Sequence, residues 1–170
     1  MKRNAKILNL LMGTSLMLIC CGAMAATQSV VATVTFDTPV SMTKNSDINF
    51  GKVKAGVADT YTITTAGAVT AAGLGQWLGG TKAAGNITVA GSTTQTVNIS
   101  VGGYTANGGV SLQNATCAYN GGAAGSCTLN GALAPAAGKS LLLGVDAVVD
   151  GTQAAGTSAA PSLTVSIVYP

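Results

Sequence analysis

The strongest constraint on the fold is an alternating stretch, Ala26–Met42, in which mainly apolar residues stand at every second position. The even-numbered positions are Gln28, Val30, Ala32, Val34, Phe36, Thr38, Val40 and Met42. The odd-numbered positions between them are mostly polar. A period of two residues is typical of a β-strand with one buried face. We therefore expect a strand here, which pairs either within its own domain or with another molecule.

An export signal precedes this stretch. Lys2, Arg3 and Lys6 form a basic head, and an apolar run follows over Ile7–Cys21. The small residues of Ala23-Met24-Ala25 suit a signal peptidase. The apolar run is short for a membrane span. The sequence therefore predicts a cleaved signal peptide over residues 1–25 and an exported protein.

The charges beyond the leader are few, and they cancel. Five lysines stand against five aspartates, so the net charge of +3 for the whole chain comes from the leader. Affinity for nucleic acid depends on basic residues that neutralise phosphates, so we expect no nucleic-acid partner. Neutral, weakly hydrated surfaces tend to associate, which suits a subunit that polymerises.

The same composition argues against catalysis. The chain has no histidine and no glutamate, so a Ser/His/Asp triad is impossible and a carboxylate pair would have to come from scattered aspartates. Two thiols without histidine make a poor zinc site. Asp146 and Asp150 leave a loose calcium site open, although the alternating ligands of a calcium loop are absent. We expect no enzyme activity, no cofactor and no resident metal.

Cys20 and Cys21 lie in the predicted signal peptide, so Cys117 and Cys127 are the two cysteines that follow it. A single pair in an exported chain predicts a disulfide, here closing the short loop between the two residues. The chain-entropy relation gives such a loop roughly 2–3 kcal/mol of stabilisation.

The rest of the chain is predicted to form short strands separated by glycine, asparagine and proline, without a sustained helical period. The expected strands are Asp47–Phe50, Thr60–Thr65, Asn86–Ala90, Thr94–Val101, Val110–Tyr119, Cys127–Leu129, Lys139–Val149 and Ser162–Tyr169. We expect the third and fourth of these to form a hairpin, and the seventh to carry a bulge at Gly144. This spacing predicts an all-β fold, a β-sandwich.

Trp77 is the single tryptophan of the chain and lies in a long glycine-rich connection. Two interpretations stay open. The indole either closes one end of the sandwich, or forms a stacking surface for a ligand such as a glycan, together with Tyr104 or Tyr119.

The last strand resembles the C-terminal signature of chaperone–usher pilins. The matching positions are Gly156, Leu163, Val165, Ile167 and the penultimate Tyr169. This resemblance implies an immunoglobulin-like β-sandwich that is incomplete and is completed by donor-strand exchange, with this last strand beside the groove that a chaperone first fills. The cysteine pair departs from the pattern, because the pair of most pilins with one disulfide lies early in the chain.

The same resemblance implies a role for the alternating start. The N-terminal extension of a pilin is its donor strand, which corresponds here to Thr27–Phe36. The side chains that would fill a neighbour's groove are Val30, Ala32, Val34 and Phe36. The implied organisation is a signal peptide over residues 1–25, an extension over 26–38 and a β-sandwich domain over 39–170.

A second resemblance covers most of the exported chain, which is similar to an exported bacterial family, domain of unknown function 4402 (DUF4402). The matching residues near the start of the domain are Pro39, Ser41, Thr43, Lys44, Asp47, Phe50, Gly51 and Val53. At the end, Thr164–Tyr169 matches the closing strand of the family. The resemblance implies the fold of a surface or fimbrial protein and no particular activity.

These patterns predict a structural subunit of a bacterial pilus or fimbria. The expected partners are sister subunits in a homopolymer, a periplasmic chaperone and an outer-membrane usher, and the expected location is the periplasm in transit and then the cell surface. One alternative is a complete secreted β-sandwich whose first strand pairs in its own sheet. Another is an adhesin that binds a host glycan through Trp77. An amyloid-type surface protein is a further alternative, against which the lack of repeats argues.

Overall fold

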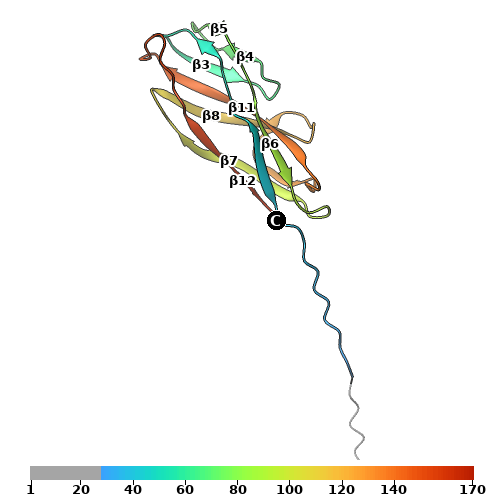
Figure 1. Ribbon diagram of the computed structural model, residues 1–170. Coiled ribbons are helices and arrows are strands. Elements are labelled where there is room, and N and C mark those ends of the chain that lie inside the picture. The colour runs from blue at the N-terminus through green and yellow to red at the C-terminus, as the bar shows by residue number, and fades with distance from the viewer. Residues whose placement is uncertain (1–27) are drawn as a thin grey trace, which may run out of the picture. The chain divides into compact units, whose positions relative to one another are not determined.

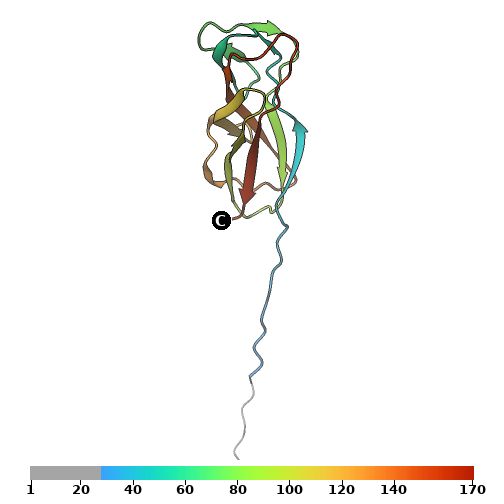
Figure 2. The ribbon, with the colours of Figure 1, turned by 90° about the vertical axis from the view of Figure 1, so that its left-hand side faces the viewer.

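The structure, a computed structural model, describes residues 28–170, so the predicted signal peptide lies outside the described residues. Within residues 28–170 all regular structure is β-strand and all strand pairs are antiparallel (Figures 1 and 2). The strands are β1 (Ser41–Ser46), β2 (Lys52–Val53), β3 (Ala58–Ile63), β4 (Val69–Ala71), β5 (Trp77–Gly79), β6 (Gly85–Ala90), β7 (Val97–Thr105), β8 (Val110–Tyr119), β9 (Gly125–Ser126), β10 (Leu129–Ala132), β11 (Lys139–Asp150) and β12 (Ser162–Val168). The predicted all-β class is confirmed.

The larger sheet is organised around β11. One edge of β11 pairs first with β6 and then with β3, and its other edge pairs with β8. β1 adds to β6, β4 adds to β3 and β9 adds to β8. A smaller sheet has the order β10-β7-β12, and β2 pairs with β5 in a two-stranded sheet. The strands of the two main sheets pack face to face as a sandwich.

The core lies between the two sheets and follows β11, because alternate residues of this strand point inward. These residues meet the inner face of β7 and the end of β12. The buried side chains of β11 are Leu141, Leu143, Val145, Ala147 and Val149, and those facing them include Val97, Ile99 and Ile167. Burial of a Val, Leu or Ile side chain is worth about 1.5–3 kcal/mol, so this row is the main source of stability.

The predicted disulfide is present. Cys117 on β8 and Cys127 just after β9 are bonded, with their Cα atoms 4.9 Å apart. Both side chains are buried and belong to the same core cluster as Leu141 and Leu143. The bridge therefore closes the β8–β9 loop and also fills part of the core.

A bulge is present beside Gly144, but it lies in β8 and not, as predicted, in β11. Asn114 and Ala115 of β8 together stand opposite Val145, and Asn114 has a φ of 52°. A Cβ atom at Gly144 would lie 2.5 Å from the Ile63 carbonyl oxygen. Glycine is required there because β3 and β8 approach β11 closely from both sides.

Several local predictions are wrong. The strand expected at Ala26–Met42 is not formed over residues 28–40, and β1 begins only at Ser41. The strand expected at Cys127–Leu129 lies further along the chain, as β10. β6 and β7 do not form a hairpin, because β6 pairs with β1 and β11 in one sheet whereas β7 pairs with β10 and β12 in the other. Both edges of β6 are already occupied, so the chain must cross between the sheets. The strand expected at Asp47–Phe50 is also not formed, because β1 ends at Ser46 and Asn49 makes an isolated bridge with Ala83.

Candidate functional site

Several strands of residues 28–170 have one unpaired edge, and two of these edge strands, β1 and β12, lie close to each other. β1 pairs with β6 alone, and β12 pairs with β7 alone. The Tyr169 hydroxyl donates a hydrogen bond of 2.7 Å to the Thr38 carbonyl oxygen, so the end of β12 lies beside the start of β1. The two strands therefore run in opposite directions. An open strand edge offers its N–H and C=O groups to an incoming strand.

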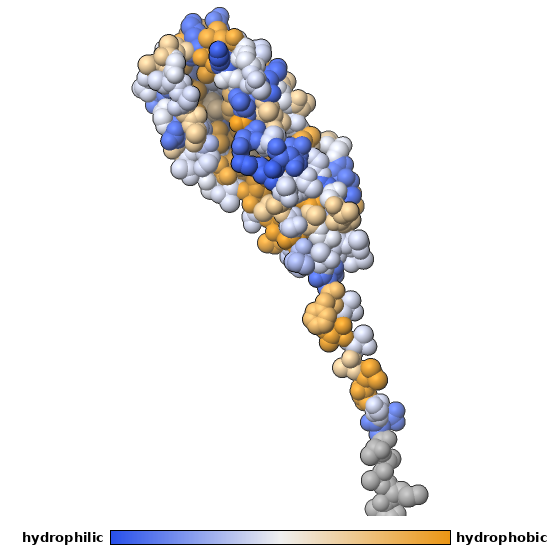
Figure 3. Space-filling model, viewed as in Figure 1, coloured by the Kyte–Doolittle hydropathy of each residue, from blue (hydrophilic) through white to orange (hydrophobic). Residues whose placement is uncertain are grey.

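A groove with a volume of about 1380 Å³ lies between these two edges. Figure 3 shows hydrophobic surface in a hollow along this face of the domain. The floor consists of core residues of the larger sheet, and the walls come from β1 with the segment after it and from β12. The floor includes Ile87, Leu112, Leu143, Ala147 and Val149, and the walls include Met42, Ile48, Phe50, Leu163 and Val165.

The wall residues occupy positions that face the core, yet they are incompletely covered. Met42 pairs with the fully buried Val89, so the two side chains share the inner face of the sheet. Met42 is nevertheless 47% exposed. On the opposite wall, Leu163 and Val165 are only half-buried, whereas Ile167 further along the same face is buried. The sandwich therefore has a row of inward-facing apolar residues without a cover.

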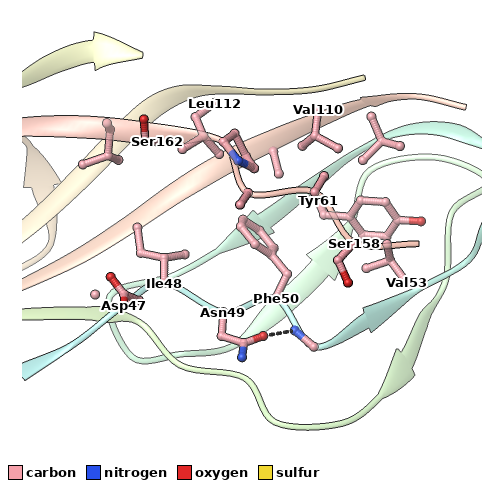
Figure 4. A pocket seen from close by; sticks show the side chains of 18 of the residues that line it. Asp47, Ile48, Asn49, Phe50, Val53, Tyr61, Val110, Leu112, Ser158 and Ser162 are labelled. Carbon is pink, nitrogen blue, oxygen red and sulfur yellow. Dashed lines mark hydrogen bonds between the residues drawn. The ribbon is translucent and has the colours of Figure 1, made fainter. Parts of the chain in front are cut away.

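The segment after β1 extends the groove beyond the strand. In Figure 4 the side chains of Ile48 and Phe50 point into the groove, towards Leu112. The Asn49 side-chain oxygen accepts a hydrogen bond of 2.8 Å from the backbone N–H of Gly51, which has a φ of 74°. This hydrogen bond fixes the turn that follows Phe50, and Ile48, Asn49 and Phe50 all line the groove.

One charged pair lies on the β1 wall. Lys44 stands opposite Ile87, which places it on the inner face of β1. Its ammonium group contacts the Asp47 carboxylate at 2.7 Å, and both side chains are largely exposed. An exposed ion pair of this kind is worth less than about 1 kcal/mol. Both residues line the groove, so the pair lies at its β1 side.

One end of the domain, which we call the base, is defined by Thr38, Ser92 and Tyr169. The Tyr169 hydroxyl accepts a hydrogen bond of 2.7 Å from the Ser92 backbone N–H while it donates to Thr38. The Ser92 side chain is 1% exposed, and its hydroxyl donates to the Asp37 carboxylate at 2.6 Å. A Cβ atom at Gly91 would collide with the Tyr169 hydroxyl. This network holds residues 37 and 38 against the base.

The opposite end, which we call the tip, is defined by β2, β5 and residues 153–161. Figure 1 shows β5 and the C-terminus at opposite ends of the domain. The Trp77 indole N–H donates to the Phe50 carbonyl oxygen at 2.9 Å, and the Lys82 ammonium lies 4.7 Å from the centre of the indole ring. The tryptophan thus ties β5 to the end of the groove wall.

The family described as domain of unknown function (DUF4402) matches residues 40–169. The chain belongs to this family. The DUF4402 domain therefore contains both walls of the groove, its floor and the tyrosine of the base. No curated protein and no solved structure matches the chain.

The sequence-predicted residues of the last strand fall on both the groove and the base of the DUF4402 domain. Leu163 and Val165 line the groove, Ile167 is in the core, and Tyr169 makes the hydrogen bonds of the base. Gly156 lies in the tip loop with a φ of 81°, a conformation that favours glycine.

The four predicted groove-filling residues precede the DUF4402 domain, in residues 28–36. The structure gives this segment no strand. Val30 is 87% exposed and Phe36 is 91% exposed, and Ala32 and Val34 are exposed as well. Their role as donor residues therefore stays a prediction, whereas the groove that they would fill is present in the DUF4402 domain.

The aromatic residues considered for ligand stacking lie on different strands and have different partners. Trp77 is 38% exposed, with one ring face next to Lys82. The Tyr104 hydroxyl accepts from the Ala115 backbone N–H at 3.3 Å. The Tyr119 hydroxyl donates to a backbone carbonyl, and burial raises the pKa of this phenol. These positions do not build a shared aromatic platform.

The acidic residues of the DUF4402 domain are engaged separately. Asp146 accepts from Thr62 and Asn114 side chains, at 2.6 and 3.0 Å. Asp150 accepts from Thr152 and Gln153, and the bond from the Thr152 backbone N–H is the main cause that lowers the pKa of Asp150. Within residues 28–170 no group of three or more acidic or cysteine side chains is arranged to hold a metal ion. In the same range no helix has the length and hydropathy of a membrane span.

Sequence reasoning missed Ser92 and the two lysines at the tip end of the groove, Lys52 and Lys54. Ser92 lay in what was predicted to be a simple hairpin turn, so no signal pointed to a buried hydroxyl. More than half of the domain sequence separates the two lysines from the groove residues of β12. A local sequence pattern does not show that residues so far apart line the same groove.

Proposed function

We propose that this DUF4402 protein is a structural, non-catalytic subunit of a bacterial surface fibre, a pilus or fimbria. The extension of one subunit inserts into the groove of another copy and completes its sandwich. The observation that supports this function is the groove itself: an apolar trough between two open, oppositely directed strand edges. An added strand would pair with exposed backbone and cover the uncovered core at once.

The size of the extension suits the groove. Strand residues rise about 3.4 Å each, so Val30 to Phe36 would span about 20 Å, as would the seven residues of β12. Val30, Ala32, Val34 and Phe36 share one face of an extended chain. Burial of a large apolar side chain is worth about 1.5–3 kcal/mol, so the four together contribute roughly 5–9 kcal/mol before entropic costs, with alanine contributing least.

The same groove accounts for the other proposed partners. Before assembly, an extended strand of a periplasmic chaperone would occupy the trough and protect the open edges from uncontrolled pairing. Subunits would then be exchanged at an outer-membrane usher and would reach the cell surface as a homopolymer. No cofactor enters this scheme. A complete secreted sandwich, the main alternative, would need one of its own strands in the groove.

The test uses the full chain, exported by a bacterial expression host, with single substitutions in the extension. Val34→Asp places a charge on the face that would enter the groove, and Thr35→Asp places the same charge on the opposite face. We expect the unsubstituted chain and the Thr35→Asp chain to form oligomers that resist detergent and dissociate on heating. The Val34→Asp chain should stay monomeric and should bind a synthetic peptide of residues 28–38.

The two variants are matched in charge and position, so general effects on solubility or export affect both equally. Loss of oligomers in both variants, or in neither, would contradict donor-strand assembly. A deletion of residues 26–36 provides a second test, because the remaining domain keeps both groove walls but has no strand to donate. Oligomers of this deleted chain would also overturn the proposal.

A further inference from the structure

The tip end of the groove is positively charged. Lys52 and Lys54 line the groove there, and Lys82 lies on the neighbouring Trp77. All three lysine side chains are exposed, and none forms an ion pair within residues 28–170. Two aspartates also lie at this end: Asp59 of β3 accepts from backbone N–H groups, and Asp150 accepts from Thr152 and Gln153. Neither forms an ion pair with a lysine of the described chain. The tip therefore has a basic rim without a partner.

The base has an acidic residue at a defined position. Asp37 follows Phe36 directly, and its carboxylate accepts the Ser92 hydroxyl and the Thr38 backbone N–H. The residue is exposed, and a carboxylate has room for further hydrogen bonds. Because residues 37 and 38 are held against the base, little free chain separates a donated Phe36 from the body of the donor domain.

An inserted strand can run in either of two directions, because β1 and β12 are opposed. In one direction Phe36 ends at the base of the acceptor, next to the point where the acceptor's own extension begins. Two copies would then exchange extensions reciprocally and close as a two-fold dimer. In the other direction Phe36 ends at the tip, the donor domain lies on the tip, and the donor's own groove remains open to a further copy. Only this direction gives an open fibre.

We infer that the donor's Asp37 contacts Lys52 and Lys54 at the tip of the acceptor, the end that Phe36 reaches when the donated strand is antiparallel to β12. This inference rests on the proposed fibre function. At about 3.4 Å per residue, Asp37 lies immediately beyond the last side chain seated in the groove. The base of one copy and the tip of the next thus form a second contact, in which the charges are complementary. Leu78, which is exposed at the rim of the groove, lies within this contact surface.

The experiment measures binding of a fluorescent peptide of residues 28–38 to full-length chains that carry Val34→Asp, so that the chain accepts a strand but does not donate one. Three acceptors are compared: Val34→Asp alone, the same chain with Lys52→Glu and Lys54→Glu, and the same chain with Lys139→Glu. Lys139 is the matched control, because it begins β11 and lines no part of the groove. A second peptide carries Asp37→Lys.

We expect the Lys52→Glu/Lys54→Glu acceptor to bind the unchanged peptide about three- to tenfold more weakly, a range typical of exposed charge pairs that are reversed. The Asp37→Lys peptide should bind the Lys52→Glu/Lys54→Glu acceptor with the lost affinity restored. The same peptide should bind the Val34→Asp parent more weakly than the unchanged peptide does. The Lys139→Glu acceptor should bind as the parent does. High salt should reduce all these differences, because it screens exposed charges.

The outcomes separate the two proposals. If neither peptide binds the Val34→Asp chain, the donor-strand function itself is wrong. If the unchanged peptide binds all three acceptors equally, the groove function stands and the contact between Asp37 and the tip lysines is overturned. A closed dimer of the unsubstituted chain in native mass spectrometry would likewise overturn the inferred direction.

Discussion

The hydroxyl of Tyr169 can be removed with little change of shape, which makes the base network testable. Tyr169→Phe deletes the acceptor of the Ser92 N–H and the donor to the Thr38 carbonyl oxygen. The Ser92 N–H is partly buried and loses its acceptor, whereas the Thr38 carbonyl is exposed and can bond to water. An unsatisfied buried group costs about 1–3 kcal/mol, and an exposed one much less, so we expect a loss of about 1–2 kcal/mol.

The free energy of unfolding would be measured by urea denaturation of the monomeric Val34→Asp chain, followed by circular dichroism. With a slope of about 1–3 kcal/mol per molar urea, the expected loss moves the midpoint down by roughly 0.5–1 M. Tyr104→Phe is the matched control, since Tyr104 is 41% exposed and its hydroxyl accepts only a long hydrogen bond of 3.3 Å. We expect less than about 0.5 kcal/mol for this control. Equal losses in the two variants would refute the claim that the base network holds the domain together.

Two further predictions concern the disulfide and acid stability. Reduction of the Cys117–Cys127 bond should lower the free energy of unfolding by about 2–3 kcal/mol, because the unfolded chain regains loop entropy, and unchanged urea midpoints with and without a reductant would contradict this. Asp150 has a pKa below its ordinary value, so it stabilises the folded state above about pH 4, and this contribution is lost as the pH falls through the lowered pKa. The melting temperature of Asp150→Asn should therefore fall less steeply than that of the unchanged chain between about pH 4 and pH 2, and parallel curves would contradict this.

The features that the sequence predicted correctly depend on neighbours along the chain. The mostly apolar run Lys139–Val149 predicted the strand that the structure shows as β11, and the terminal alternation predicted β12 and its inward face. The disulfide followed from the fact that a single pair of cysteines lies beyond the predicted signal peptide. In each case the signal lies within about twelve residues of the chain. For β12 the physical cause, one face in the core and one in water, acts on the strand by itself.

The wrong predictions concern which strands pair with each other, and not which side of a strand is buried. β6 and β7 are separated by a short turn and still belong to different sheets, because β1 and β11 occupy both edges of β6. Local turn chemistry gives no information about this competition for edges. The buried hydroxyl of Ser92 was missed for the same reason, since its role depends on Asp37 and Tyr169 from the two ends of the domain.

The amino-acid sequence by itself determined the class of fold, the inward face of the last strand, the disulfide and the lack of a catalytic triad. The tertiary structure alone decided that β1 and β12 face each other across an uncovered core with both outer edges open. The physical reason is that alternation specifies which side of a strand is buried, whereas the neighbour of that strand is decided by long-range pairing among all available edges. The residues of a strand therefore do not indicate that one of its edges lacks a partner. The unpaired edge is seen only when the two sheets are packed together.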